Sequence, residues 1–151
     1  MATYNKYTAA VEPLVENINA GTDAWKIALS NTINAADTTF TPGTTDLPTS
    51  GGYTAGGTAV TITSSSQSAG TYKLVLTSPS VWTATGGGFT FRYVILWDST
   101  TSTPVGYWDY GSHDKCTNTK LASNYKYAVH RLDRHNEYRY TKLDISPNNL
   151  R

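Results

Sequence analysis

Large apolar side chains alternate with other residues along Phe89–Trp97, and this pattern constrains the fold more than any other feature of the chain. A period of two predicts a β-strand. The side chains expected to share one face of this strand are Phe89, Phe91, Tyr93, Ile95 and Trp97. Val94 and Leu96 make the other face apolar at its far end, as in a central strand that is covered on both sides.

Shorter alternating segments occur along the rest of the chain, with polar or glycine-rich turns between them. They are Trp25–Ser30, Thr58–Ser64, Thr71–Thr77, Val81–Thr83 and Val105–Tyr110. Short strands separated by turns predict a mainly β fold, either a small antiparallel β-sandwich or an open barrel. The side chains that we expect to form its core are Trp25, Leu29, Ile62, Leu74, Leu76, Phe91, Tyr93 and Ile95.

The N-terminal segment shows a helical spacing instead. Its apolar residues recur at intervals of three and four: Tyr7, Val11, Leu14 and Ile18. We predict one helix over residues 4–20, kinked at Pro13 and ended by Gly21. The expected organisation is an N-terminal helix in residues 1–22, a β-sandwich body in residues 23–112 with a long surface loop over residues 31–50, and a tail over residues 113–151.

Charge changes abruptly where the tail begins. Residues 1–112 hold four Lys/Arg and seven Asp/Glu, a net charge of −3, whereas residues 113–151 hold eight and four, a net charge of +4. All three His and the single Cys also lie in the second segment. We expect an irregular basic tail that contains Tyr and His. Because acidic residues dilute its charge, we do not expect nucleic acid as a partner.

The sequence shows neither a membrane-spanning segment nor a signal peptide. No apolar run approaches the length that spans a membrane, and the first residues lack the apolar core of a signal peptide. We expect a chain that is made in the cytoplasm, has no membrane partner and stays soluble or is built into a larger assembly.

Catalytic and cofactor-binding motifs are also missing. The segment Gly51–Gly57 lacks the Lys-Ser/Thr ending of a phosphate-binding loop, so we interpret it as a turn. The body has no His to activate a nucleophile, and its carboxylates are far apart in the sequence. We therefore predict no enzyme activity, no catalytic residue and no cofactor. The acidic residues that we expect mostly at solvated strand ends are Asp23, Asp37, Asp46, Asp98 and Asp109.

One group of residues has ligand chemistry suited to zinc: His113, Cys116, His130 and His135. The hydrophobic residues that build a zinc finger are missing at their usual places, so we favour chance grouping over a metal site. Trp82, Trp97 and Trp108 allow two interpretations as well. They could form a platform on which sugars stack, but we favour burial in the core of a small β domain.

The order of several segments resembles a diffuse family of small tailed-bacteriophage virion proteins. Its members open with a short helix, followed by a strand ending like Leu29-Ser30-Asn31-Thr32. A turn like Gly52-Tyr53-Thr54-Ala55-Gly56-Gly57 comes next, and then an aromatic hairpin ending like Trp108-Asp109-Tyr110-Gly111. The matching strands are Trp25–Leu29, Tyr72–Leu76, Val81–Thr83, Phe91–Trp97 and Val105–Gly111. The resemblance covers residues 4–112 and carries no catalytic residues.

The resemblance implies a structural protein of the phage particle. The specific role that we favour for this chain is a head decoration or cement protein. We expect its partners to be the major capsid protein or other virion proteins, and we expect the chain to form a homo-oligomer. A neck, tail or fibre-attachment subunit is the alternative, and a β-sandwich module that binds host glycans is another. The residues that we expect at an interface are Tyr7, Val11, Tyr53, Trp82, Trp108 and Tyr110.

The tail departs from the family, in which a further β-hairpin follows Gly111-Ser112. One hypothesis is that a reading-frame shift produced residues 113–151. This predicts that Tyr125, Tyr138 and Tyr140 are exposed and that an edge strand stays unpaired. The competing hypothesis is a functional tail that buries these Tyr on a neighbouring subunit.

Overall fold

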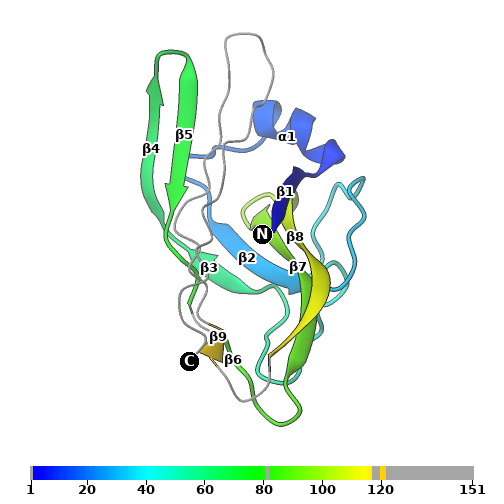
Figure 1. The fold of residues 1–151 in the computed structure, drawn as a ribbon. Helices are drawn as coiled ribbons and strands as arrows, with labels where there is room; N and C mark the ends of the chain where they lie inside the picture. The colour runs from blue at the N-terminus through cyan, green and yellow to red at the C-terminus, as the bar shows by residue number, and fades with distance from the viewer. Residues whose placement is uncertain (1, 81, 117–119, 122–151) are drawn as a thin grey trace.

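The computed structural model describes residues 2–80, 82–116 and 120–121, and within them the chain is mainly β (Figure 1). The largest sheet has five antiparallel strands in the order β1-β8-β7-β2-β3. They are β1 (Thr3–Lys6), β8 (Thr103–Cys116), β7 (Phe89–Asp98), β2 (Trp25–Ser30) and β3 (Thr58–Val60). The prediction of a small antiparallel fold is confirmed as a sandwich-like arrangement, and the described strands do not close into a barrel.

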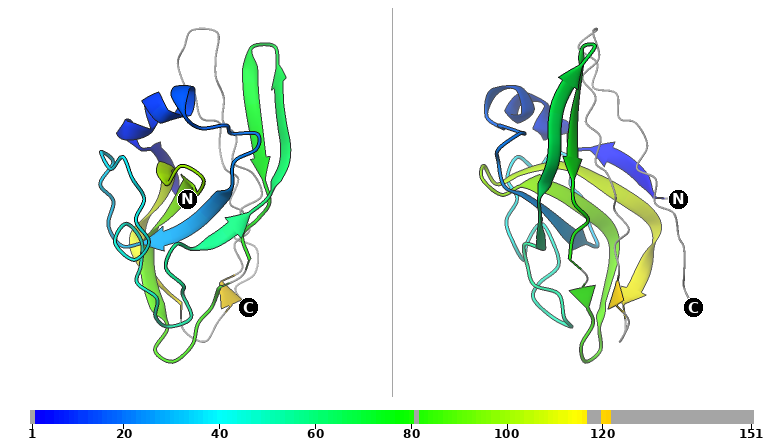
Figure 2. Two further views of the ribbon diagram at one scale, coloured as in Figure 1. Left: turned by 180° about the vertical axis from the view of Figure 1, so that it is seen from behind. Right: turned by 90° about the vertical axis from the view of Figure 1, so that its left-hand side faces the viewer.

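Two short sheets complete the described strands. β4 (Ile62–Ser68) and β5 (Thr71–Leu76) form a hairpin, and β6 (Trp82–Thr83) pairs with β9 (Lys120–Leu121). Figure 2 shows that the β4–β5 hairpin projects away from the five-stranded sheet. The predicted strand over 58–64 is split at Thr61, because the backbone of Thr61 bonds to Thr77 and β4 bends away through a bulge between Ile62 and Ser64.

The predicted helix over residues 4–20 is wrong in extent. Its start is the edge strand β1, because Tyr4 pairs with Trp108 of β8 and their rings lie 5.0 Å apart. A single 3-10 turn (Thr8–Ala10) leads into the short helix α1 (Val11–Glu16). Pro13 lies in the first turn of α1, where a missing backbone N–H costs no helical hydrogen bond. The helix is closed by the Asn17 N–H, which donates to the Pro13 carbonyl at 2.9 Å, and not at Gly21.

The core follows the prediction at six of eight positions. The predicted core residues that are buried are Trp25, Leu29, Leu74, Leu76, Phe91 and Ile95. Ile62 and Tyr93 are half-buried. The far half of β7 is buried throughout, which confirms a central strand covered on both faces.

The predicted common face of β7 is wrong, because the strand changes face near Arg92. Phe91 packs in the same cluster as Val94 and Leu96, whereas Ile95 and Trp97 belong to a second cluster. The pairing with β8 jumps from Phe91 opposite Asp114 to Tyr93 opposite Asp109, so β8 carries extra residues at this point. Such a bulge interrupts the alternation that a regular strand would keep.

β8 also continues past the predicted end of the body. Val105–Tyr110 is the middle of a strand that runs on to Cys116 and stays paired with β7, since Phe89 lies opposite Cys116. The segment 113–116 is therefore part of the five-stranded sheet and not of an irregular tail. Residues 122–151, on which the two hypotheses about the tail depend, lie outside the described residues.

Candidate interaction surfaces

Four of the six predicted interface residues are in the interior. Tyr7, Tyr53, Trp82 and Trp108 are at most 5% exposed, so they cannot contact a partner. The same large aromatic area that favours an interface also favours burial in a small β domain, and here burial dominates. Val11 on α1 is exposed, and Tyr110 on β8 is half-buried, so these two remain reachable.

The tryptophans do not form a sugar-stacking platform. All of Trp25, Trp82, Trp97 and Trp108 are at most 5% exposed, which confirms the interpretation as core. Trp97 stacks on Phe40 with ring centroids 4.0 Å apart, and its indole N–H donates to the Gly56 carbonyl at 3.3 Å. The large ring faces that a glycan would need are therefore occupied by other side chains.

The glycine-rich segment is a turn, as predicted, and its glycines meet a structural need. Gly51, Gly52, Gly56 and Gly57 all have positive φ. A Cβ on Gly57 would lie 2.0 Å from the Ile27 carbonyl oxygen, so this loop is pressed against β2. Backbone geometry and close approach both exclude larger residues at such positions.

A buried carboxylate, Asp46, holds this turn to the loop before it. It accepts hydrogen bonds from the backbone N–H groups of Gly43 and Gly56, both at 2.6 Å, and from the Tyr53 hydroxyl at 2.5 Å. The Tyr53 oxygen also accepts from the Leu29 N–H at 3.1 Å. Burial and the Asp46 carboxylate together raise the pKa of Tyr53, which stays neutral. This network fixes the loop on the sheet and leaves no free group for chemistry.

Asp98 is the second buried carboxylate among the described residues, so the expectation of solvated strand ends is wrong for it as well as for Asp46. It is fully buried and accepts from the Thr100 N–H at 2.8 Å and from the Thr101 hydroxyl at 2.9 Å. Burial raises the pKa of Asp98, and so does the hydrogen-bonded Asp23 carboxyl. The two bonds from Thr100 and Thr101 lower this pKa, but the net shift is upward. The Asp23–Asp98 pair joins the segment before β2 to the end of β7.

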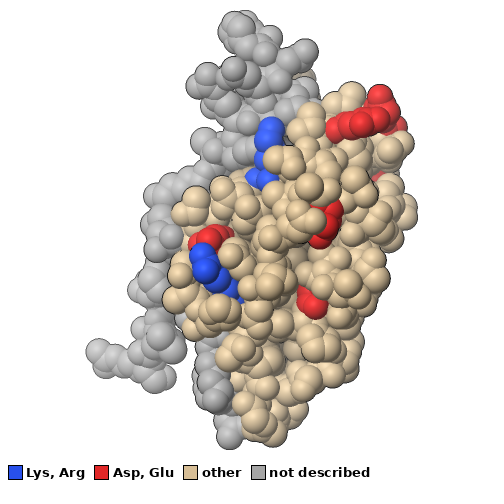
Figure 3. Space-filling model, turned by 90° about the vertical axis from the view of Figure 1, so that its right-hand side faces the viewer, with Lys and Arg blue, Asp and Glu red and all other residues tan. Residues whose placement is uncertain are grey.

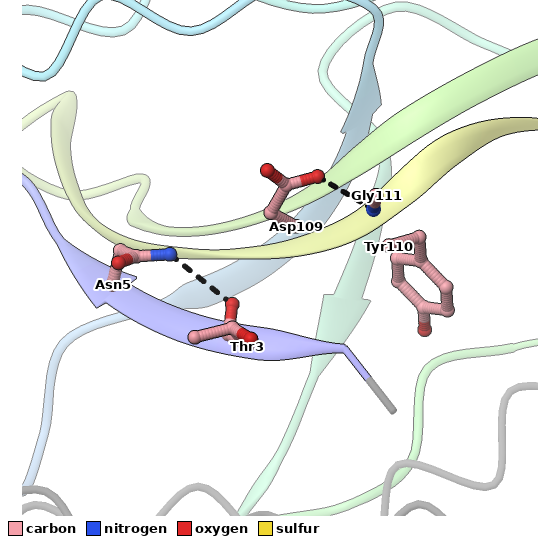
Figure 4. Close-up of a pocket in the computed structure, with 5 residues that line it drawn as sticks. All are labelled: Thr3, Asn5, Asp109, Tyr110 and Gly111. Carbon is pink, nitrogen blue, oxygen red and sulfur yellow. Dashed lines mark hydrogen bonds between the residues drawn. The ribbon is translucent and has the colours of Figure 1, made fainter.

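An open depression of about 370 Å³ lies between β1 and β8 (Figure 4). It is lined by Thr3, Asn5, Asp109, Tyr110 and Gly111. Asp109 is engaged by Arg92 through two bonds of 2.9 and 3.0 Å, and the Arg92 guanidinium lowers the pKa of the Asp109 carboxyl. Asp109 also accepts from the Gly111 N–H at 2.7 Å. The Asp109 carboxylate at the rim of the depression is therefore engaged by Arg92 and Gly111.

The structure describes two of the four predicted metal ligands, His113 and Cys116. His113 is exposed and Cys116 is buried, because residues three apart on a strand point to opposite faces. His130 and His135 lie outside the described residues. Within the described part of the chain, no three potential ligands lie close enough together to hold a metal ion.

Among the described residues, the β4–β5 hairpin offers an extended exposed surface that the pattern of aromatic residues does not predict. All residues of β4 after Ile62 are exposed, and the tip is a two-residue turn, Ala69-Gly70, with positive φ at both positions. The Ser65 and Tyr72 hydroxyls lie 2.8 Å apart, and a Cβ on Gly21 would lie 2.8 Å from Ser65 Oγ. The hairpin is thus braced on one face by the segment before β2. The signal in the sequence was a long run of Ser and Thr without a charge.

The rest of the visible surface carries few charges. Figure 3 shows acidic and basic side chains scattered over one face, separated by wide uncharged areas. Apolar exposure is small: Val11 is 37% and Val15 is 70% exposed, both on α1. Among the described helices, none has the length and apolar character that crossing a membrane requires.

Comparison with protein-family models, with curated proteins and with solved structures found no match for this chain.

Proposed function

We propose that the chain is a structural protein of a tailed-bacteriophage particle, and specifically a head decoration protein that stabilises the capsid. One observation carries the proposal: a β-hairpin, β4–β5, whose single charged side chain is Lys73, projects from a small, well-packed β body (Figure 2). A braced arm whose strand β4 exposes polar, uncharged side chains is suited to lie across a neighbouring subunit. Short Ser and Thr side chains lose little conformational entropy when they are fixed there.

The environment of the polar groups supports a binding role over a catalytic one. The two buried carboxylates are occupied by backbone and hydroxyl donors, and the one described ion pair, Arg92–Asp109, is held within the sheet. The sequence resemblance over residues 4–112 adds the phage particle as the setting. In this proposal the partners are the major capsid protein and further copies of the chain, and the mature location is the virion.

The alternative within the particle is a neck, tail or fibre-attachment subunit. An arm that reaches a neighbour suits these roles too, but they differ in stoichiometry. The glycan-binding alternative loses its main argument, because the tryptophan faces are buried. Copy number therefore separates the proposals better than any property of the isolated chain.

The test is quantitative mass spectrometry of purified particles, combined with heat challenge of heads that lack the protein. A decoration protein is expected at a copy number comparable to that of the major capsid protein, and heads without it should release DNA at a lower temperature. Adding back the purified chain should restore stability, whereas a variant without residues 63–72 of the hairpin should not. A few copies per particle would support the neck or tail role, and absence from the particle would refute both.

A further inference from the structure

The free edges of the described sheets are not equally protected. An unpaired edge strand exposes backbone N–H and C=O groups that pair readily with another strand, and proteins usually shorten, charge or cover such edges. In the five-stranded sheet, β1 is short and carries Lys6, and β3 is only Thr58–Val60. β4 is longer, and after Ile62 it contains no charge and no Pro.

The edge of β4 is open along its whole length within the described residues. β4 pairs only with β5, and its sheet contains no third described strand. The bulge lies at its start, between Ile62 and Ser64, so Ser64–Ser68 is a regular stretch. We propose that this stretch pairs antiparallel with the same stretch of a second copy, so that a two-fold axis passes next to Ser66.

The chemistry of β4 selects its own copy as the occupant. After Ile62 both faces of the strand carry polar and mostly short side chains, so recognition rests on the backbone and on small hydroxyl groups, which β4 itself supplies. The one charged side chain of the hairpin is Lys73, on the opposite strand, so the two β4 edges bring no like charges together. A two-fold contact of this kind is closed and self-complementary.

The hairpin geometry sets the register at Ser66. Residues that flank a two-residue turn form a hydrogen-bonded pair, here Ser68 and Thr71, and the pattern alternates along the ladder. Ser66 therefore directs its backbone groups to β5, and its neighbours Ser65 and Gln67 direct theirs outward. Across the two-fold axis, Ser66 becomes a non-hydrogen-bonded pair with itself, with Cα atoms about 4.5 Å apart.

A negative charge at Ser66 is expected to weaken the dimer without weakening the fold of the monomer. Ser66→Glu faces Lys73 within its own hairpin, which favours the fold, but it faces a second Glu across the proposed interface. By sedimentation velocity at about 100 μM, where micromolar complexes are populated, we expect the wild-type chain to be a dimer. Ser66→Glu should weaken the dimer at least about tenfold, because like charges at an interface repel.

The matched control is Ser80→Glu, which adds the same charge at an exposed residue outside the hairpin. It should leave the dimer unchanged. A monomeric wild-type chain, or an equally tight dimer of Ser66→Glu, would refute the proposal. These measurements use the isolated full-length chain, so they do not depend on the virion role.

A cross-linking experiment tests the register independently. Non-hydrogen-bonded pairs place Cα atoms within the range that a disulfide spans. Under mild oxidation, Ser66→Cys should form a covalent dimer, whereas the wild-type chain should not, because its Cys116 is buried. Ser80→Cys should also remain uncross-linked. If Ser66→Cys gives no more covalent dimer than Ser80→Cys, the proposed pairing is wrong.

Discussion

At the scale of single residues, the buried Asp46 carboxylate is the side chain on which the longest loop most depends. Asp46→Ala removes the acceptor for the Gly43 and Gly56 N–H groups and for the Tyr53 hydroxyl, and leaves the Gly56 and Tyr53 donors buried. We expect the free energy of unfolding to fall by about 3 kcal/mol or more, since each unsatisfied buried group costs about 1–3 kcal/mol. Urea denaturation measures this.

The matched control for that change is Asp37→Ala in the same loop. The Asp37 carboxylate accepts an exposed hydrogen bond from the Asn34 side chain at 2.6 Å. Its loss should cost under about 1 kcal/mol, because solvent replaces the bond. Equal losses at both positions would show that Asp46 does not hold the loop as described.

At Tyr7, in contrast to Asp46, we expect that removal of the polar group does not lower the free energy of unfolding. The Tyr7 side chain is fully buried, and its hydroxyl finds no hydrogen-bond partner among the described residues. Tyr7→Phe removes a desolvated polar atom and keeps the ring, so the free energy of unfolding should stay equal or rise by up to about 1 kcal/mol. Tyr7→Ala, measured in the same thermal or urea melts, should lower it by about 3–5 kcal/mol. A clear loss in Tyr7→Phe would mean that the hydroxyl has a partner.

At the scale of elements, the docking of β1 depends on a glycine in β8. A Cβ on Gly106 would lie 2.1 Å from the Tyr4 hydroxyl oxygen, so the Tyr4 ring occupies the space that this glycine leaves. Gly106→Ala should displace the ring, speed amide exchange in residues 3–6 and lower the free energy of unfolding by about 1–3 kcal/mol. Gly87→Ala is the control, because its Cβ would meet nothing within 4 Å.

A double-mutant cycle shows whether Tyr4 causes this effect. In a Tyr4→Ala background, the cost of Gly106→Ala should largely disappear, since the clash is removed. A cost that persists in full would place the strain in the β8 backbone.

The contact between the start of β2 and the end of β7 predicts a dependence on pH. Burial and the Asp23 carboxyl raise the pKa of Asp98 above its ordinary value of 3.8, so the folded chain binds this proton more tightly than the unfolded chain. The resulting stability is fully present below pH 3.8 and is lost as the pH rises through the raised pKa. Asp98→Asn keeps a neutral partner for Thr100 and Thr101 and should remove this loss.

The free energy of unfolding of the wild type and of Asp98→Asn is measured between pH 3 and 8. This range begins roughly 1 unit below ordinary carboxyl pKa values and ends roughly 4 units above them. The difference between variant and wild type should grow in favour of Asp98→Asn as the pH rises. The Arg92–Asp109 pair, whose carboxyl pKa is lowered, contributes with the opposite sign in both proteins and cancels in the difference. A difference that does not change with pH would contradict the assignment.

At the scale of the whole molecule, local alternation predicted the strands but not the faces. The period of two located β2, β5 and β7, because each strand keeps apolar residues at alternate positions. The change of face near Arg92 was not predictable, since it depends on extra residues in the distant strand β8. The Asp46 network was hidden for a similar reason: its donors meet only when the loop folds back on itself.

Four of the six predicted interface residues are buried, because large aromatics serve cores and interfaces equally well. Only the three-dimensional arrangement shows that Tyr7, Tyr53, Trp82 and Trp108 face inward. The surface that we propose for interaction is instead the uncharged, Ser-rich segment of β4, which alternation does not distinguish from an ordinary strand and turn.

The surface of the whole molecule predicts how the chain is held on the proposed particle. The hairpin carries one charged side chain, Lys73, and the charges on the visible face are scattered (Figure 3). Contacts through such a surface depend on backbone and hydroxyl hydrogen bonds and on shape, and salt screens these little. At about 1 M NaCl the Debye length is only about 3 Å, so contacts between exposed charges are weakened. We expect the chain to sediment with particles at this salt concentration as fully as at low salt, as judged by gel analysis of the pellet, and release by salt alone would show that charge holds it in place.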